Sequence, residues 1–161
     1  MVALVKVFIS ADLEGISGVV GSSQTGPDPT EEYARACRLM TRQVNAAVAG
    51  ALEGGADLVV INDSHGSMRN ILIEELHPRA RLITGSPKPL SMMQGVEGSD
   101  LAFFVGYHSM AGTPGVLNHT YSSRTVHALR IAGRAAGETL LNAGIAGHYG
   151  VPVVLVTGEE A

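Results

Sequence analysis

Five short apolar runs rich in β-branched residues recur along the chain and predict strands. They occupy residues 4–11, 58–61, 81–84, 101–105 and 151–156. The runs are continuous and do not alternate between apolar and polar positions, which is typical of parallel strands covered on both faces. The pattern therefore predicts an α/β fold with an open, mostly parallel sheet and flanking helices.

The long stretch between the first two runs has the periodicity of a helix instead. Apolar side chains recur there at spacings of three and four residues, at Tyr33, Cys37, Met40, Val44, Val48 and Ala51. Pro29-Thr30 predicts the start of this helix and Gly54-Gly55 its end. A strand, a helix of this length and a second strand form a βαβ unit, which requires parallel strands.

Shorter patterns fill the rest of the chain. Residues 70–76 and 91–94 predict short helices, 126–131 predict a strand that Ala132-Gly133 turns into a hairpin, and 137–148 predict a second long helix. The Gly-, Pro- and Ser-rich residues 15–29 are too many for a simple turn and predict an active-site loop. A length of 161 residues without repeats predicts a single domain, 1–161.

Composition narrows the classes of partner and compartment. The formal net charge is −4 and there is no basic run, which argues against nucleic acid and against an anionic membrane surface. Lys6 interrupts the first apolar run and no cleavage motif follows, so we expect a strand there and a cytoplasmic protein. The single cysteine, Cys37, rules out a disulfide within the chain and Cys-based zinc sites, and we expect it to be a buried hydrophobe.

Polar residues with ligand chemistry follow the predicted strands at the point where each one stops. Asp12 and Glu14 follow the first strand, His65 the second and His108 the fourth. In an open parallel sheet these points share the carboxyl edge, where such folds bind ligands. Glu138 begins a predicted helix and could reach the same place. We therefore expect these five side chains to form a metal site at the carboxyl edge of the strands.

The charge of this cluster favours two cations over one. Three gathered carboxylates are costly to bury unless they are compensated. One divalent cation would leave the cluster negative, whereas two would leave it positive by a charge that a shared hydroxide neutralises. Mixed imidazole and carboxylate ligation suits zinc, and Mn²⁺, Co²⁺ or Fe²⁺ would also fit. The pattern is that of a hydrolase with two metal ions.

Alternatives remain open at this stage. Asp63 could be a ligand, or it could orient His65 from outside the site. A dinuclear phosphoesterase could use the same ligand types, although Arg124 is the one basic residue near His119 in sequence. A scaffold domain without metal, whose carboxylates are merely solvated, is a third possibility. His119 alone would most simply be a hydrogen-bonding loop residue.

Five linked motifs together resemble the bacterial zinc-dependent D-aminopeptidase family that is associated with dipeptide-transport operons. They are Ser10–Gly18, Asn62–His65, Gly106–His108, Thr113–Val116 and Gly137-Glu138. The resemblance implies that Asp12 bridges two zinc ions, that Glu14 and His108 complete one site, and that His65 and Glu138 complete the other. It also implies that His119 is the catalytic residue, described in the family as a nucleophile.

The same resemblance implies substrates and an assembly. These are short peptides with an N-terminal D-residue and a ring-like homo-oligomer, with a decamer expected. Members of the family continue well beyond the point matched by Ala161, so residues 1–161 resemble the N-terminal part of a longer chain. The remaining part would pack on the first and help to enclose the site or to build the oligomer. A zinc-binding domain without activity is therefore a further alternative.

Overall fold

The computed structural model describes residues 4–26, 28 and 30–159, and its centre is one five-stranded sheet. The strands lie in the order β3-β2-β1-β4-β7, and each neighbouring pair is parallel. Their bounds are β1 (Lys6–Ala11), β2 (Leu58–Asp63), β3 (Ala80–Ile83), β4 (Leu101–Tyr107) and β7 (Val153–Gly158). This arrangement confirms the predicted parallel α/β sheet.

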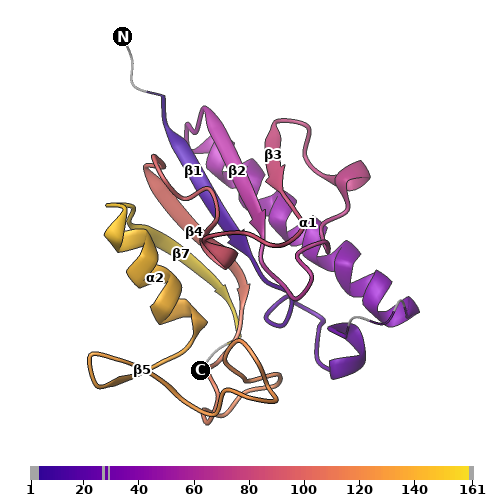
Figure 1. Ribbon diagram of the computed structural model, residues 1–161. Coiled ribbons are helices and arrows are strands. Elements are labelled where there is room, and N and C mark those ends of the chain that lie inside the picture. Colours follow the sequence, from indigo (N-terminus) through magenta and orange to yellow (C-terminus); the bar gives the residue numbers. More distant parts are fainter. Residues whose placement is uncertain (1–3, 27, 29, 160–161) are drawn as a thin grey trace.

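Helices cover both faces of the sheet (Figure 1). The helix α1 (Glu31–Glu53) packs on one face. The helix α2 (Glu138–His148) and the short 3-10 helix η3 (Ser91–Met93) pack on the other. Further 3-10 turns are η1 (Ser22–Gln24) and η2 (Ile73–Glu75), and β5 (Leu129–Ile131) forms a hairpin with β6 (Arg134–Ala136). Thr30 caps α1 through its side chain, as Pro29-Thr30 predicted, although Pro29 itself lies outside the described residues.

The central strand β1 contributes to two separate apolar cores. Val7 and Ile9 pack with the buried stripe of α1, which includes Met40 and Val44. Phe8 points the other way and packs with the core that η3 and α2 build. Burial on both faces explains why this strand is a continuous apolar run.

Several boundaries differ from the sequence prediction for identifiable reasons. The strands β2 and β4 continue through polar or glycine residues to Asp63 and Tyr107, because those residues still pair with their neighbours at the carboxyl edge. The last strand begins at Val153, since Pro152 has no amide hydrogen to donate to the ladder. The two predicted short helices are single 3-10 turns, η2 and η3.

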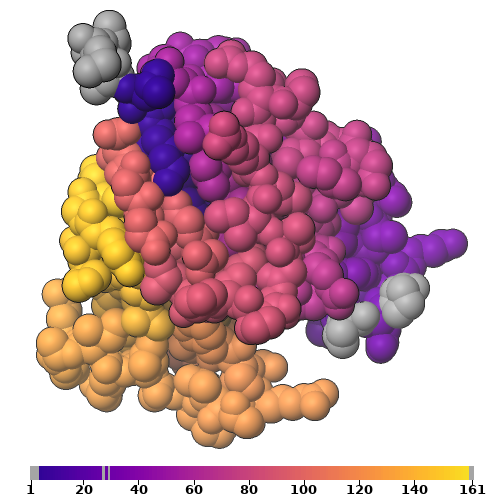
Figure 2. Space-filling view, turned by 45° about the horizontal axis from the view of Figure 1, so that its top comes forward, coloured from indigo at the N-terminus to yellow at the C-terminus, as the bar shows by residue number. Residues whose placement is uncertain are grey.

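The order of the strands places a topological switch at β1. Its neighbours are β2 on one side and β4 on the other, so the loops after these strands diverge at the carboxyl edge. The segment between β4 and α2, orange in Figures 1 and 2, gathers at this end of the molecule. Open α/β sheets bind ligands at such points. None of the helices formed by the described residues has the length and apolar character needed to cross a membrane.

Candidate metal centre

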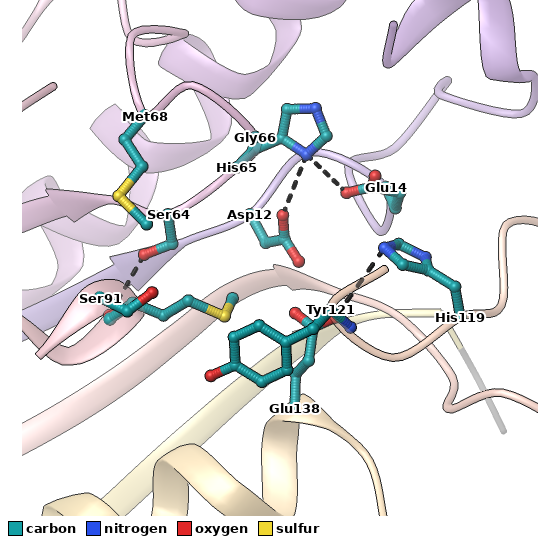
Figure 3. A pocket seen from close by; sticks show the side chains of 11 residues that line it. Asp12, Glu14, Ser64, His65, Gly66, Met68, Ser91, His119, Tyr121 and Glu138 are labelled. Carbon is teal, nitrogen blue, oxygen red and sulfur yellow. Dashed lines mark hydrogen bonds and ion pairs between the residues drawn. The ribbon is translucent and has the colours of Figure 1, made fainter. Parts of the chain in front are cut away.

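The structure brings all five predicted ligands together at the carboxyl edge of the sheet. Asp12 and Glu14 follow β1, His65 follows β2, His108 follows β4, and Glu138 is the first residue of α2. Asp12, Glu14, His108 and Glu138 are buried, and the side chain of His65 is 11% exposed. Figure 3 shows Asp12, Glu14, His65 and Glu138 around one cavity.

Two glycines allow the loop after β1 to lie against the end of β4. A side chain at Gly15 would place its Cβ 2.0 Å from the carbonyl oxygen of Tyr107, and one at Gly106 would lie 2.2 Å from the carbonyl oxygen of Asp12. Gly106 also has a φ of +76°, in the left-handed region that favours glycine. This close approach brings Asp12 and Glu14 beside His108.

His65 is fixed by one ring nitrogen and faces two carboxylates with the other. Its Nε2 lies 2.9 Å from the carbonyl oxygen of Thr25, so Nε2 carries a hydrogen and donates it. Its Nδ1 lies 2.9 Å from Oε2 of Glu14 and 3.4 Å from Oδ1 of Asp12. A backbone carbonyl that fixes the ring in this way is typical of metal-binding histidines.

His108 is arranged in the same manner on the other side of Asp12. Its Nδ1 lies 2.9 Å from the carbonyl oxygen of Ser109, which directs Nε2 toward the site. That Nε2 lies 3.4 Å from Oδ2 of Asp12 and 3.5 Å from Oε1 of Glu138. The two oxygens of Asp12 therefore face different imidazoles, which is the geometry that a bridging carboxylate needs.

The shortest contacts pair the outer carboxylates with imidazoles differently from the arrangement that the family resemblance implies. Glu14 lies closest to His65, and Glu138 lies beside His108. One potential metal-binding group nevertheless consists of Asp12, Glu14 and His108, whose ligand atoms lie within 4.8 Å of one another. Asp12 is common to both arrangements.

His119 lies next to this cluster on the loop between β4 and α2. Its Nδ1 lies 2.9 Å from the carbonyl oxygen of Leu117, and its Nε2 lies 3.8 Å from Oε1 of Glu138. The ring stacks on that of His108 with a centroid distance of 4.1 Å. Its side chain is 20% exposed, compared with 2% for that of His108, so a bound molecule could reach it.

The site's ionisable groups are strongly perturbed by one another. Burial and the charge of Glu14 raise the pKa of Asp12 to about 7. Burial would also raise the pKa of Glu14, but the hydrogen bond and charge of His65 outweigh it and lower this pKa to about 2. Burial opposes protonation of the imidazoles, yet the facing carboxylates raise the pKa of His65 to about 11 and that of His108 to about 9. The cluster thus requires positive charge among its carboxylates.

A divalent cation fits this requirement and the geometry. Oδ2 of Asp12 and Nε2 of His108 are buried and, within the described part of the chain, have no hydrogen-bond partner. Leaving such atoms unpaired costs about 1–3 kcal/mol each. Zinc binds nitrogen and oxygen ligands at about 2.0–2.1 Å, so neighbouring ligands of a tetrahedral ion lie about 3.3 Å apart. The separation of 3.4 Å between these two atoms is close to that spacing.

Asp63 does not take part in the cavity. Its carboxylate accepts hydrogen bonds from the backbone amides of Asn70 and Ile71 and from the side chain of Asn70. The side chain of Asn70 also donates to the carbonyl oxygen of His65. Asp63 therefore orients the loop that carries His65, which is the second of the two roles considered from the sequence.

The remaining walls of the cavity come from residues that the sequence did not single out. The cavity has a volume of about 270 Å³. In addition to His119 and four of the five ligands, all except His108, it is lined by Ser64, Gly66, Met68, Ser91, Met92 and Tyr121. Tyr121 has a φ of +55°, and its backbone amide donates a 2.7 Å hydrogen bond to Oε1 of Glu138. In the sequence, only the position of Tyr121 two residues after His119 indicated that it could line the site.

Comparison with known proteins identifies the family. Residues 5–161 match the family model described as D-aminopeptidase. The chain belongs to the D-aminopeptidase family. A D-aminopeptidase of Bacillus subtilis (strain 168) is 41% identical over 162 residues, which cover 96% of this chain and 56% of that protein. This family membership confirms the predicted resemblance and does not support the phosphoesterase alternative.

A solved structure of the D-aminopeptidase family has the same fold. It is described as the zinc-dependent D-aminopeptidase DppA from Bacillus subtilis, a self-compartmentalizing protease. It is 41% identical, with a TM-score of 0.91, and the match covers 95% of this chain and 56% of that one. This member of the D-aminopeptidase family thus spans a little over half the length of the relatives it matches.

Proposed function

We propose that this chain carries the metal centre of a zinc-dependent aminopeptidase that hydrolyses short peptides with an N-terminal D-residue. The observation that carries the proposal is a pair of buried ligand atoms 3.4 Å apart, Oδ2 of Asp12 and Nε2 of His108, neither of which has a hydrogen-bond partner among the described residues. They lie within a cluster of three carboxylates and two imidazoles. Membership of the D-aminopeptidase family supplies the reaction class.

Two zinc ions would be held by the five clustered side chains, with Asp12 shared between them. Glu14, His65, His108 and Glu138 would supply the other protein ligands. Bound zinc supplies a Lewis acid for the scissile carbonyl and lowers the pKa of a bound water toward 7. The charge of the cluster supports two ions, because two divalent cations and a hydroxide balance three carboxylates. Mn²⁺, Co²⁺ or Fe²⁺ could replace zinc in a site with these ligands.

His119 is the proposed catalytic residue. The hydrogen bond from Nδ1 to the carbonyl oxygen of Leu117 leaves the lone pair of Nε2 directed toward Glu138 and the cavity. From there the lone pair could attack the scissile carbonyl, whereas a ring that has taken up a proton on Nε2 could pass it to the leaving amine or donate a hydrogen bond to the developing oxyanion. Each role requires the same contact between Nε2 and the scissile peptide group.

We further propose that residues 1–161 form one metal-binding domain of a larger ring-like homo-oligomer. The support is the outer strand β7, in which Val154, Leu155 and Val156 are 54%, 37% and 51% exposed. An edge strand with consecutive exposed aliphatic side chains is a surface for further protein contact. The decameric ring expected from the family resemblance would use such surfaces.

The test is an assay of D- and L-aminoacyl dipeptides with the zinc-loaded chain, with and without a chelator. Release of the N-terminal residue from the D-substrate, abolished by the chelator and restored by zinc, is the expected result. Zinc binding without any turnover would identify a metal-binding domain that needs additional protein to act. Substantially less than one metal per chain after zinc addition would refute the metal centre itself.

A further inference from the structure

A second hollow adjoins the metal centre at Glu14 and His119. It has a volume of about 530 Å³ and shares Glu14 and His119 with the cavity that contains the ligands. Its remaining lining comes from two loops, with Ser22, Thr25 and Gly26 on one and Val116, Leu117, Asn118, Ser123 and Arg124 on the other. We call it the Arg124 groove. A molecule held against His119 could therefore extend from the cavity into this groove.

Among the described residues that line either hollow, Arg124 is the only lysine or arginine. Its side chain is exposed, and the structure shows no hydrogen bond or ion pair for it with any described residue. A guanidinium is planar, always charged, and donates two parallel hydrogen bonds to a carboxylate. The groove therefore offers one uncommitted cation beside the catalytic residue.

The position of Arg124 matches the place where a short peptide carries its terminal carboxylate. Asp12 and Glu138 line only the cavity, Glu14 lines both hollows, and Arg124 lines only the groove. An aminopeptidase that removes the first residue of a dipeptide leaves a free carboxylate one residue beyond the scissile bond, about 3.5 Å farther along an extended chain. A cation that binds this carboxylate must lie near the catalytic residue, and Arg124 lines the same hollow as His119.

We infer that Arg124 binds the C-terminal carboxylate of the substrate and restricts the enzyme to very short peptides, dipeptides above all. The inference rests on the proposed aminopeptidase function and adds its substrate class. It also assigns a role to Arg124, the basic residue near His119 in sequence, that does not require the phosphate substrate of the phosphoesterase alternative. Arg124 acts in this scheme through affinity and selection, and it does not touch the reacting atoms.

The experiment compares two substrates that differ only in this charge, D-alanyl-glycine and D-alanyl-glycinamide, with the zinc-loaded protein. For the wild type, kcat/KM is expected to be about five- to tenfold higher for the acid, which is typical of one partly exposed charged hydrogen-bonded pair. In Arg124→Gln the acid-to-amide ratio should fall to about one, with the change in the KM for the acid, because the ion pair is present in both bound substrate and transition state. Arg124→Lys should keep part of the preference.

The matched control is Arg134→Gln, which removes the same charge from an exposed position that lines neither hollow. It should keep the wild-type ratio. An unchanged ratio in Arg124→Gln, or no preference in the wild type, would overturn the role of Arg124 while amide hydrolysis still supports the aminopeptidase. If neither substrate is hydrolysed, hydrolysis by this chain alone is refuted; calorimetric binding of the two peptides to the zinc-loaded protein then decides on Arg124, and equal affinities refute its role.

Discussion

Each histidine of the site is oriented by a contact between one ring nitrogen and a backbone carbonyl oxygen. In His65, His108 and His119 one ring nitrogen faces a backbone carbonyl oxygen and the other points toward a carboxylate. The sequence could single out His65 and His108 because they follow predicted strands, and the family resemblance added His119. It could not predict their partners, because the carbonyl that fixes His65 belongs to Thr25, 40 residues away in the chain.

At this scale His119→Ala tests the division between metal binding and catalysis. His119 is not among the five proposed ligands, so zinc content should remain at the wild-type value. Turnover of a D-alanyl dipeptide should fall by about 10²–10⁴, the usual contribution of a positioned acid, base or nucleophile. Elemental analysis and kcat on the same sample measure both. A variant that loses its zinc would show instead that Nε2 of His119 is a ligand.

The control for this substitution is His127→Ala, which removes an exposed histidine that lines neither hollow. Its zinc content and kcat should both equal those of the wild type. A His119→Ala enzyme that matches this control in kcat would refute the catalytic assignment.

At the scale of elements, continuous apolar runs predicted the strands because parallel strands are buried on both faces. The helix α1 was predicted equally well, since its stripe of buried residues recurs at helical spacing. The exact ends of β2 and β4 were not predicted, because Asn62, Asp63 and Tyr107 still pair with neighbouring strands after the apolar run has ended. Those extra residues carry the loops closer to the metal centre.

The contact between the β1 loop and β4 can be tested by Gly106→Ala. The new methyl group would lie 2.2 Å from the carbonyl oxygen of Asp12, and the residue would keep a left-handed φ. We expect a loss of about 3 kcal/mol in the free energy of unfolding, together with weaker zinc binding, because Asp12 must move. Denaturant unfolding and a zinc titration measure the two effects.

Gly147→Ala is the matched control within α2, where an added Cβ has no neighbour within 4 Å. It should leave zinc affinity unchanged and stabilise the protein slightly, by up to about 1 kcal/mol, since alanine favours helix. Equal behaviour of the two variants would show that the glycine at position 106 is not needed for the close approach.

The outer strand β7 predicts the association behaviour of the chain. Val154 and Val156 lie two residues apart, so both side chains point to the same face, and both are more than half exposed. We expect the protein to associate with increasing concentration and Val154→Lys to reduce this association, because an edge lysine opposes strand pairing. Analytical ultracentrifugation measures the mass.

The control places the same lysine at Val20, which is 68% exposed in a loop. Val20→Lys adds the same charge but should not change the mass at any concentration. Identical masses for wild type and Val154→Lys across the concentration range would rule out β7 as the contact surface.

At the scale of the whole molecule, the metal centre ties together segments that are distant in the chain. Its ligands come from the ends of β1, β2 and β4 and from the start of α2. A cation bound only by the folded state adds about 4 kcal/mol of stability at a thousandfold excess over its Kd. For a domain of this size that corresponds to a rise in Tm of about 10 °C. We therefore expect zinc to raise Tm by this order and a chelator to reverse the rise.

Asp12→Asn separates binding at the centre from nonspecific effects of zinc. The amide keeps the shape of Asp12 but cannot supply a carboxylate to two ions, so most of the zinc-dependent rise should disappear. In the absence of metal, the substitution should not lower the unfolding temperature. It removes one of three crowded carboxylates, so the metal-free variant should unfold at the same temperature as the metal-free wild type or higher. Calorimetry of both proteins with zinc and with chelator gives all four values. An equal zinc-dependent rise in both would place the bound metal outside the cluster around Asp12.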